Sequence, residues 1–168
     1  MMTRFSCQCA LRWSDMDAFG HVNNVRYLTL YEEARVALLF DAARNARAEG
    51  MSDGLVVVRH EIDYLRPIDH GAAAADDGSS RHVTIELWTE EIRASRFTVA
   101  YELFDLGRLA SRARTVLAPY DLRAGRPRRL TDPERSFLAA WRDENDSAVA
   151  GLAAAAGQAA PVDRAAGG

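Results

Sequence analysis

Two carboxylates, a glycine and a histidine lie close together near the N-terminus, in the stretch RWSDMDAFGHVNNVRYLTLYEEAR between Arg12 and Arg35. Asp15, Asp17 and His21 fall in a compact polar turn that leads into a helix. A carboxylate just before a helix N-terminus lies beside backbone N–H groups that lack an intrahelical partner, and beside the positive end of the helix dipole. Such N–H groups can polarise a carbonyl while the carboxylate attacks it or activates a water molecule.

Asp17 is the candidate nucleophile or general base, because both roles need an ionised carboxylate within hydrogen-bond reach of the reacting atom. The sequence does not choose between these two routes. A structural alternative is that Asp17 only caps the turn before the helix, where aspartate is common for conformational reasons. We expect Asp15, two residues earlier, to accept backbone or arginine hydrogen bonds and to shape the loop.

Four further residues complete the candidate site. His21 either orients the loop and contacts the substrate, or is a structural hydrogen-bonding group. Asn24 either places a water molecule or caps the helix. Gly20 permits a close approach of the backbone to the substrate, and Tyr27 is expected in the core or in the pocket wall. The candidate catalytic residues are thus Asp17, His21 and Asn24, and Gly20 and Tyr27 are candidate substrate-binding residues.

One long helix is predicted to position this turn. From Asn24 to Glu49 the chain has no proline or glycine, and apolar residues recur at spacings of three and four. Asn23 or Asn24 would cap this helix and Gly50 would end it. The predicted apolar stripe consists of Val25, Leu28, Leu30 or Tyr31, Ala34, Leu38, Leu39 and Ala42. The predicted solvated side carries Glu32, Glu33, Arg35, Asp41, Arg44 and Arg47.

The remainder of the chain is predicted to form antiparallel strands and one short helix. The alternation of apolar and polar residues predicts strands at residues 6–14, 55–65, 83–92, 97–104 and 109–118, with a hairpin turn at 105–108. In the second strand, one face should carry Val56, Val58, Ile62 and Tyr64. A short helix is expected at 132–143, capped by Thr131. One long helix among antiparallel strands favours an α+β fold in which the sheet packs on the helix.

The polar turn resembles the active-site segment of the hotdog-fold thioesterases of the 4-hydroxybenzoyl-CoA thioesterase family. Their pattern, D-x-D-x-x-G-H-V-N-N followed by a tyrosine, is present here as Asp15, Asp17, Gly20, His21, Val22, Asn23, Asn24 and Tyr27. The resemblance implies a hotdog fold, in which a curved antiparallel sheet wraps around one long central helix. It also implies that Asp17 carries the hydrolysis of an aliphatic or aromatic acyl-CoA to the free acid and CoA. A homodimer or homotetramer with sites at the subunit interface is implied as well.

Two arginines are candidates for holding the phosphates of coenzyme A. Arg93 and Arg96 lie in the segment EIRASRF, which resembles the basic stretch of the family near the nucleotide end of the ligand. The family often has a denser cluster there, so the carrier is either coenzyme A or an acyl carrier protein. Arg112 and Arg114 share a strand face and are second candidates, with a solvated role as the alternative.

A hotdog dehydratase, a binding module, a zinc hydrolase and a serine thioesterase are the alternatives to this interpretation. A hotdog dehydratase or hydratase usually carries a D-x-N-P-x-H pattern, which DMDAFGH does not reproduce. A non-catalytic hotdog module that binds acyl-CoA is compatible with the sequence. Neither the H-E-x-x-H spacing of a zinc hydrolase nor the G-x-S-x-G elbow of a serine thioesterase is present. We therefore expect no metal and no cofactor.

Length, charge and composition limit the organisation and the partners. The 168 residues suit one domain, which we place at residues 6–146, followed by an alanine- and glycine-rich tail at 147–168 that we expect to be disordered. A net charge of -3 gives no electrostatic reason to bind nucleic acid or an anionic membrane. No signal peptide or long apolar span is recognisable, so the expected location is the cytoplasm. The two cysteines, Cys7 and Cys9, are expected to stay reduced.

Overall fold

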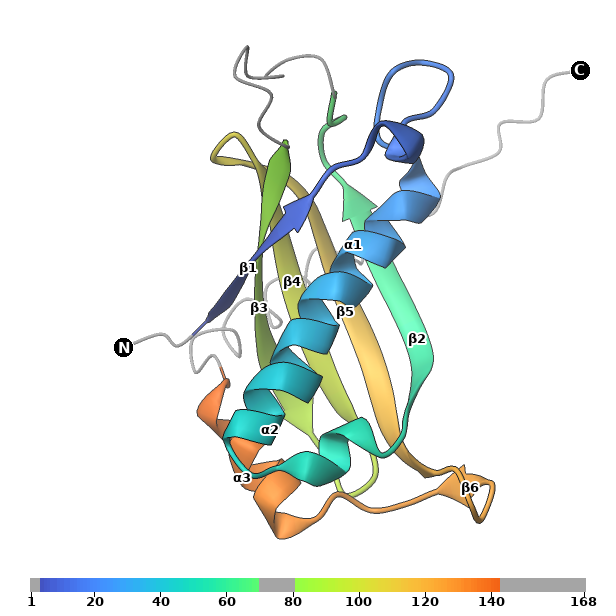
Figure 1. Cartoon of the computed structure of the whole chain (residues 1–168), viewed down its shortest axis with the longest axis vertical. Coiled ribbons are helices and arrows are strands. Elements are labelled where there is room, and N and C mark those ends of the chain that lie inside the picture. The colour runs from blue at the N-terminus through green and yellow to red at the C-terminus, as the bar shows by residue number, and fades with distance from the viewer. Residues whose placement is uncertain (1–3, 70–80, 143–168) are drawn as a thin grey trace, which may run out of the picture.

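The fold is an antiparallel sheet whose inner face is crossed by one long helix (Figure 1). A computed structural model describes residues 4–69 and 81–142 of the chain. The strands are β1 (Phe5–Ala10), β2 (Leu55–Tyr64), β3 (His82–Ile92), β4 (Phe97–Asp105), β5 (Arg108–Asp121) and the short β6 (Arg126–Pro127). Their order in the sheet is β1-β3-β4-β5-β2, β6 pairs with β5, and every pairing is antiparallel. This architecture confirms the predicted α+β class.

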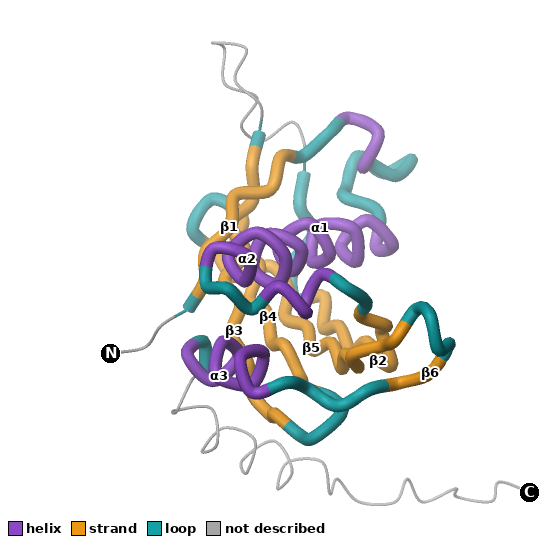
Figure 2. Tube along the Cα trace, turned by 60° about the horizontal axis from the view of Figure 1, so that its bottom comes forward, coloured by secondary structure: helices purple, strands orange, loops and turns teal. Residues whose placement is uncertain are grey.

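The long helix is continuous over 22 residues, although its hydrogen-bonding pattern changes along its length. It consists of α1 (Asn24–Val36), the π-helical segment η2 (Ala37–Ala42) and α2 (Ala43–Asn45). A short 3-10 turn, η3 (Glu49–Ser52), follows it. The helix lies on one side of the sheet in both views (Figures 1 and 2). It runs along the sheet, so that its first turn is at one end of the sheet and α2 is at the other (Figure 1).

The start of the helix is as predicted, but its predicted end at Gly50 is wrong. The side chain of Asn23 accepts a hydrogen bond from the N–H of Val25 at 3.0 Å, so Asn23 is the N-cap. At the other end, the N–H groups of Arg47 and Ala48 donate to the carbonyls of residues 44 and 43. These two bonds form a Schellman motif, in which Arg47 takes the left-handed conformation (φ 60°) that glycine usually supplies.

The buried side of the helix is turned relative to the predicted stripe. Tyr27, Leu30, Tyr31, Ala34, Leu38, Leu39 and Ala43 are buried against the sheet. Val25, which was expected in the stripe, is 62% exposed, and Arg35, which was expected in solvent, is buried. Tyr31 sets this orientation, because its hydroxyl donates a 2.8 Å hydrogen bond to Oγ of Ser111 on β5. Arg35 lies one turn further along the same side and must be buried with it.

The strand β2 differs from its predicted facing because it contains a β-bulge. Its pairing with β5 skips Val58, which is 60% exposed. One extra residue in a strand exchanges the faces of the residues on its two sides. As a result Val57, rather than Val56, shares a face with Ile62 and Tyr64.

The other elements agree closely with those predicted from the sequence, except at the end of the first strand. β1 ends at Ala10, and residues 13–15 form a 3-10 turn, η1 (Trp13–Asp15), instead of continuing the strand. The helix α3 (Asp132–Ala140) begins after the predicted cap Thr131, whose side chain accepts from the N–H of Glu134. The end predicted for this helix at Asp143, and the predicted tail at 147–168, lie outside the described residues. Within the described ranges, no helix is both long and apolar enough to cross a membrane.

The packing of the central helix predicts the cost of truncating a side chain there. Leu38 is fully buried between the helix and the sheet, so Leu38→Ala should lower the free energy of unfolding by about 2–5 kcal/mol, as measured by chemical denaturation. The exposed Val25 is the matched control, and Val25→Ala should change the free energy of unfolding by less than about 0.5 kcal/mol. Equal effects of the two substitutions would contradict the assigned helix orientation.

Candidate active site

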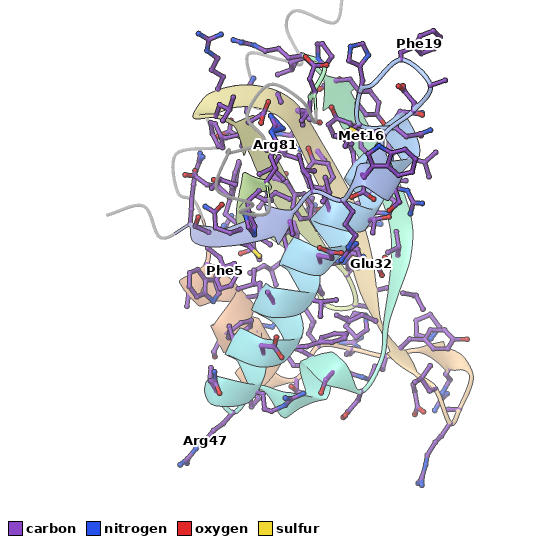
Figure 3. All side chains as sticks on the ribbon, turned by 45° about the horizontal axis from the view of Figure 1, so that its top comes forward. Phe5, Met16, Phe19, Glu32, Arg47 and Arg81 are labelled. Atoms are coloured by element: carbon purple, nitrogen blue, oxygen red, sulfur yellow. The ribbon has the colours of Figure 1, made fainter. Side chains whose placement is uncertain are left out.

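The loop between η1 and α1 is folded around the carboxylate of Asp17. Its Oδ1 accepts the N–H of Phe19 at 2.8 Å and the N–H of His21 at 3.1 Å, and its backbone N–H donates to the carbonyl of His21 at 2.7 Å. Gly20 completes the turn with a φ of 80°, a backbone conformation that residues with a side chain rarely adopt. Figure 3 shows Phe19 at the tip of this loop, directed away from the protein. Oδ2 of Asp17 has no hydrogen-bond partner among the described residues, so one oxygen stays open.

Asp15 ties the same loop to the start of the helix. Its Oδ2 accepts the N–H of Arg12 at 2.8 Å, and Nε of Arg26 lies 3.7 Å from Oδ1. The carbonyl of Asp15 accepts the N–H of Asn23 at 2.8 Å. The side chain is buried. These are the contacts of a residue that shapes the loop, which is the role expected for Asp15 from the sequence.

A cavity of about 340 Å³ opens beside the loop, between the start of α1 and the end of β2. Because Asn23 is the N-cap, Asn24 is the first helical residue, and its N–H is one of the first-turn groups that have no partner within the helix. The cavity is lined by Asp17, His21, Val22, Asn24, Tyr27, Tyr64, Leu65, Arg66 and Pro67. The structure thus brings Asp17, His21, Asn24 and Tyr27 to one cavity, with Gly20 in the adjacent turn.

Two tyrosines form the wall of this cavity. The rings of Tyr27 and Tyr64 meet edge to face, with centroids 5.1 Å apart, and the hydroxyl of Tyr64 donates to the carbonyl of Asn24 at 3.0 Å. Burial raises the pKa of Tyr27 to about 12, and Asp105 adds to the effect. Tyr27 therefore stays neutral at ordinary pH, as a wall residue should.

His21 is held by the segment that follows β2. Its Nε2 lies 3.2 Å from Oδ1 of Asp69, and the two residues form an isolated antiparallel bridge. Next to them, the N–H of Val22 donates to the carbonyl of Ile68 at 2.8 Å. Sequence reasoning missed Asp69, Tyr64 and the rest of this wall. The sequence predicts the end of this strand at residue 65, but a strand end does not reveal which loop it will meet.

The two arginines expected to bind the carrier lie far from Asp17 within this chain. Arg93 and Arg96 are in the turn between β3 and β4, where the N–H of Arg93 donates to the carbonyl of Arg96 at 2.8 Å. A side-chain hydrogen bond from Arg93 to Glu91 raises the pKa of Arg93. At about 3.3 Å per strand residue, this turn is roughly 30 Å from the Asp17 end of the sheet. Arg93 and Arg96 could therefore act at a cavity of this kind only from a neighbouring subunit.

The second pair of candidate arginines is already engaged in ion pairs. Nε of Arg112 lies 3.1 Å from Oε1 of Glu102, and Nε of Arg114 lies 2.9 Å from Oε2 of Glu90. Neither arginine lines the cavity at Asp17. Within residues 4–69 and 81–142, no group of three or more histidine, cysteine or acidic side chains is placed to hold a metal ion.

Comparison with known proteins relates this geometry to a family. The model of the thioesterase-like superfamily matches residues 11–156 of the chain. A thioesterase from Thermus thermophilus, solved in complex with coenzyme A and zinc, is 27% identical, with a TM-score of 0.63 over 81% of this chain and 92% of that one. A protein described as a predicted thioesterase from Bacillus stearothermophilus has a TM-score of 0.68 at 23% identity, over 84% and 98% of the two chains.

Two further similarities differ in extent. A 1,4-dihydroxy-2-naphthoyl-CoA thioesterase from Synechocystis is 20% identical, with a TM-score of 0.63 over 86% of this chain and 98% of that one. The uncharacterized protein YsmA of Bacillus subtilis is 33% identical over 64 residues, which are 38% of this chain and only 42% of YsmA.

The curved sheet, the single central helix and the carboxylate loop at its start define a hotdog-fold protein of the thioesterase type. The chain belongs to the thioesterase-like superfamily and is a thioester hydrolase.

The raised pKa of Tyr27 predicts how the stability of the protein depends on pH. Because burial raises the pKa of Tyr27 from 10 to about 12, the stability that its neutral phenol contributes is fully present below about pH 10. As the pH rises from 10 to 12, the unfolded chain ionises first, and this contribution is lost. The stability should therefore fall less steeply over this range in Tyr27→Phe than in the parent, as measured by denaturation at each pH. Identical slopes would mean that Tyr27 ionises freely in the folded protein.

Proposed function

We propose that the protein hydrolyses an acyl thioester of coenzyme A to the free acid and the thiol, with Asp17 as the nucleophile or general base. The single observation that carries this proposal is the division of the Asp17 carboxylate. Oδ1 is held by two backbone N–H groups, while Oδ2 has no partner among the described residues and Asp17 lines the cavity. A carboxylate in that arrangement is oriented and still able to react.

Both chemical routes use the same parts. As a general base, Asp17 takes a proton from water, the hydroxide adds to the thioester carbonyl, and the tetrahedral intermediate expels the thiolate, which takes the proton back from Asp17. As a nucleophile, Asp17 adds to the carbonyl and expels the thiolate, and water then hydrolyses the resulting mixed anhydride. In either route, negative charge builds on the carbonyl oxygen. The first-turn N–H groups of α1, beginning at Asn24, would stabilise it.

The other cavity residues have positioning roles in this proposal. Asn24 places the attacking water, His21 keeps the loop on the segment that carries Asp69, and Gly20 lets the loop approach the thioester closely. Tyr27 forms the wall against which the acyl group packs. Arg93 and Arg96 remain candidates for the carrier only from a neighbouring subunit.

The choice of coenzyme A as the carrier is supported by two relatives. The T. thermophilus thioesterase was solved with coenzyme A, and the Synechocystis protein is named for a CoA thioester. An acyl carrier protein, which presents the same pantetheine arm, is the other carrier to be tested. The acyl group can be aliphatic or aromatic.

Replacing the proposed catalytic carboxylate should stop turnover without unfolding the protein. Asp17→Asn keeps an oxygen that can accept the two loop N–H groups but cannot serve as a base, so kcat should fall by at least about a hundredfold. Thiol release from short-chain, long-chain and aromatic acyl-CoAs, and from the matching acyl carrier protein thioesters, provides the measurement.

The matched control is Asp41→Asn, which removes an exposed carboxylate from the central helix and should leave kcat unchanged. Near-normal turnover by Asp17→Asn would refute the proposed role. Binding of acyl-CoA without turnover, unaffected by loss of Asp17, would indicate a binding module. Incorporation of heavy oxygen from labelled water into Asp17 during turnover would identify the nucleophilic route.

We also propose that two copies join through β2, the edge strand that borders the cavity. On the described part of the chain, β2 pairs only with β5, so its other edge has unpaired backbone groups. It also exposes Val57, Val58 and Tyr64, and Leu65 directly after it is exposed too, which is unusual for an edge left in water. Pairing of two such edges would give a homodimer with the cavities at the boundary, and two dimers could form a homotetramer.

A charge on this edge should separate the subunits. The parent should have at least twice the 18.5-kDa mass of one chain in solution, as measured by sedimentation equilibrium. Val58→Lys should shift the equilibrium towards the monomer, because lysine blocks edge pairing. A monomeric parent, or an equally stable Val58→Lys dimer, would contradict the proposed interface.

A further inference from the structure

A second cavity, of about 390 Å³, adjoins the one at Asp17. Arg66 and Pro67 line both cavities, so they form the boundary between them. The second cavity is otherwise lined by the turn between β4 and β5 and the strand after it, through Asp105, Leu106, Arg108 and Ala110. A ligand that extends from Asp17 past Pro67 would therefore reach this turn.

The second cavity has an excess of positive charge. Its carboxylate, Asp105, lies 2.6 Å from Nη2 of Arg81, a buried arginine just before β3. Nε and Nη1 of Arg81 are buried and have no hydrogen-bond partner among the described residues. In Figure 3, Arg81 lies near the end of the sheet that carries the Phe19 loop. Because Arg81 compensates Asp105, the guanidinium groups of Arg66 and Arg108, which have no ion-pair partner on the described residues, are left uncompensated.

These two arginines are attached to fixed backbone. The N–H groups of Leu65 and Arg66 both donate to the carbonyl of Ala110, at 2.9 and 3.1 Å. Arg108 is the first residue of β5, and its backbone lies opposite that of Asp105 in the β4–β5 hairpin. The Arg66 backbone is thus joined to the strand that begins with Arg108. A ligand bound between the two side chains would meet a preorganised backbone.

We propose that Arg66 and Arg108 bind the phosphate groups of the carrier to which the acyl group is attached. The inference rests on the proposed function, because it takes the thioester to lie at Asp17. In phosphopantetheine carriers, a neutral pantetheine arm separates the thioester from the first phosphate. The phosphate must therefore lie away from Asp17, and the second cavity is the adjoining space. Guanidinium groups match phosphate oxygens in charge and in forked geometry.

The test compares carriers that share the acyl-pantetheine arm and differ in the phosphate-bearing group attached to it. Rates are measured with an acyl-CoA, with the same acyl group on pantetheine, which has no phosphate, and with the same acyl group on an acyl carrier protein. In Arg66→Gln and in Arg108→Gln, the ratio of kcat/KM for acyl-CoA to that for acyl-pantetheine should fall about tenfold, chiefly through KM. The KM of the parent for acyl-CoA should also rise with salt.

Two further measurements make the result specific. Arg123→Gln removes an exposed arginine from the turn between β5 and β6 and should leave the ratio unchanged. Calorimetric binding of coenzyme A itself should weaken by at least about tenfold in the Arg66→Gln/Arg108→Gln double variant. Since this binding needs no turnover, it tests the phosphate site even if the protein hydrolyses none of the acyl thioesters.

Each outcome bears on the inference. An unchanged kcat/KM ratio together with an unchanged affinity for coenzyme A in the double variant would overturn it. A fall in both the ratio and the affinity on replacing Arg93 and Arg96, instead of Arg66 and Arg108, would overturn it as well. If kcat/KM relative to acyl-pantetheine falls for both acyl-CoA and the acyl carrier protein thioester, the phosphate that these two carriers share lies at these arginines. If it falls for acyl-CoA alone, the nucleotide phosphates lie there.

Discussion

The burial of one side of the central helix against the sheet is the constraint on which the rest of the structure depends. Tyr31, hydrogen-bonded to Ser111, fixes the rotation of the helix. The same rotation places Tyr27 one turn earlier, beside the end of β2. The first turn of the helix and the carboxylate loop therefore meet a wall whose position is set by the packing of the core. A helix free to rotate would keep its polar first turn but would have no cavity beside it.

The elements of the fold were predictable because each depends on local pattern. Apolar spacing indicated the helix, alternation indicated the strands, and Thr131 and Asn23 are caps whose side chains bond to nearby N–H groups. The carboxylate loop was recognisable for a related reason. Asp17, Gly20 and His21 interact with one another within five residues of sequence, so their types and spacing carry the geometry.

The errors arise where tertiary contacts decide. The periodicity predicts Arg35 on the solvated side, opposite the apolar stripe, but the hydrogen bond from Tyr31 to Ser111 turns that side of the helix inward. The bulge at Val58 has no sequence signal of its own. The contacts of Asp69 with His21, and of Arg66 with β5, join residues that are far apart in the chain. Periodicity cannot reveal such pairs, and the wall of the cavity was missed for that reason.

The bulge in β2 has a consequence for how the protein avoids uncontrolled association. A straight, apolar edge strand accepts almost any other strand, including those of unfolded chains, and so invites fibre growth. The bulge at Val58 divides the free edge of β2 into two short runs that are offset by one residue. A regular strand can match only one run at a time, whereas a partner with a corresponding irregularity can match both. The bulge that the sequence does not predict therefore limits which strands can pair with the free edge of β2.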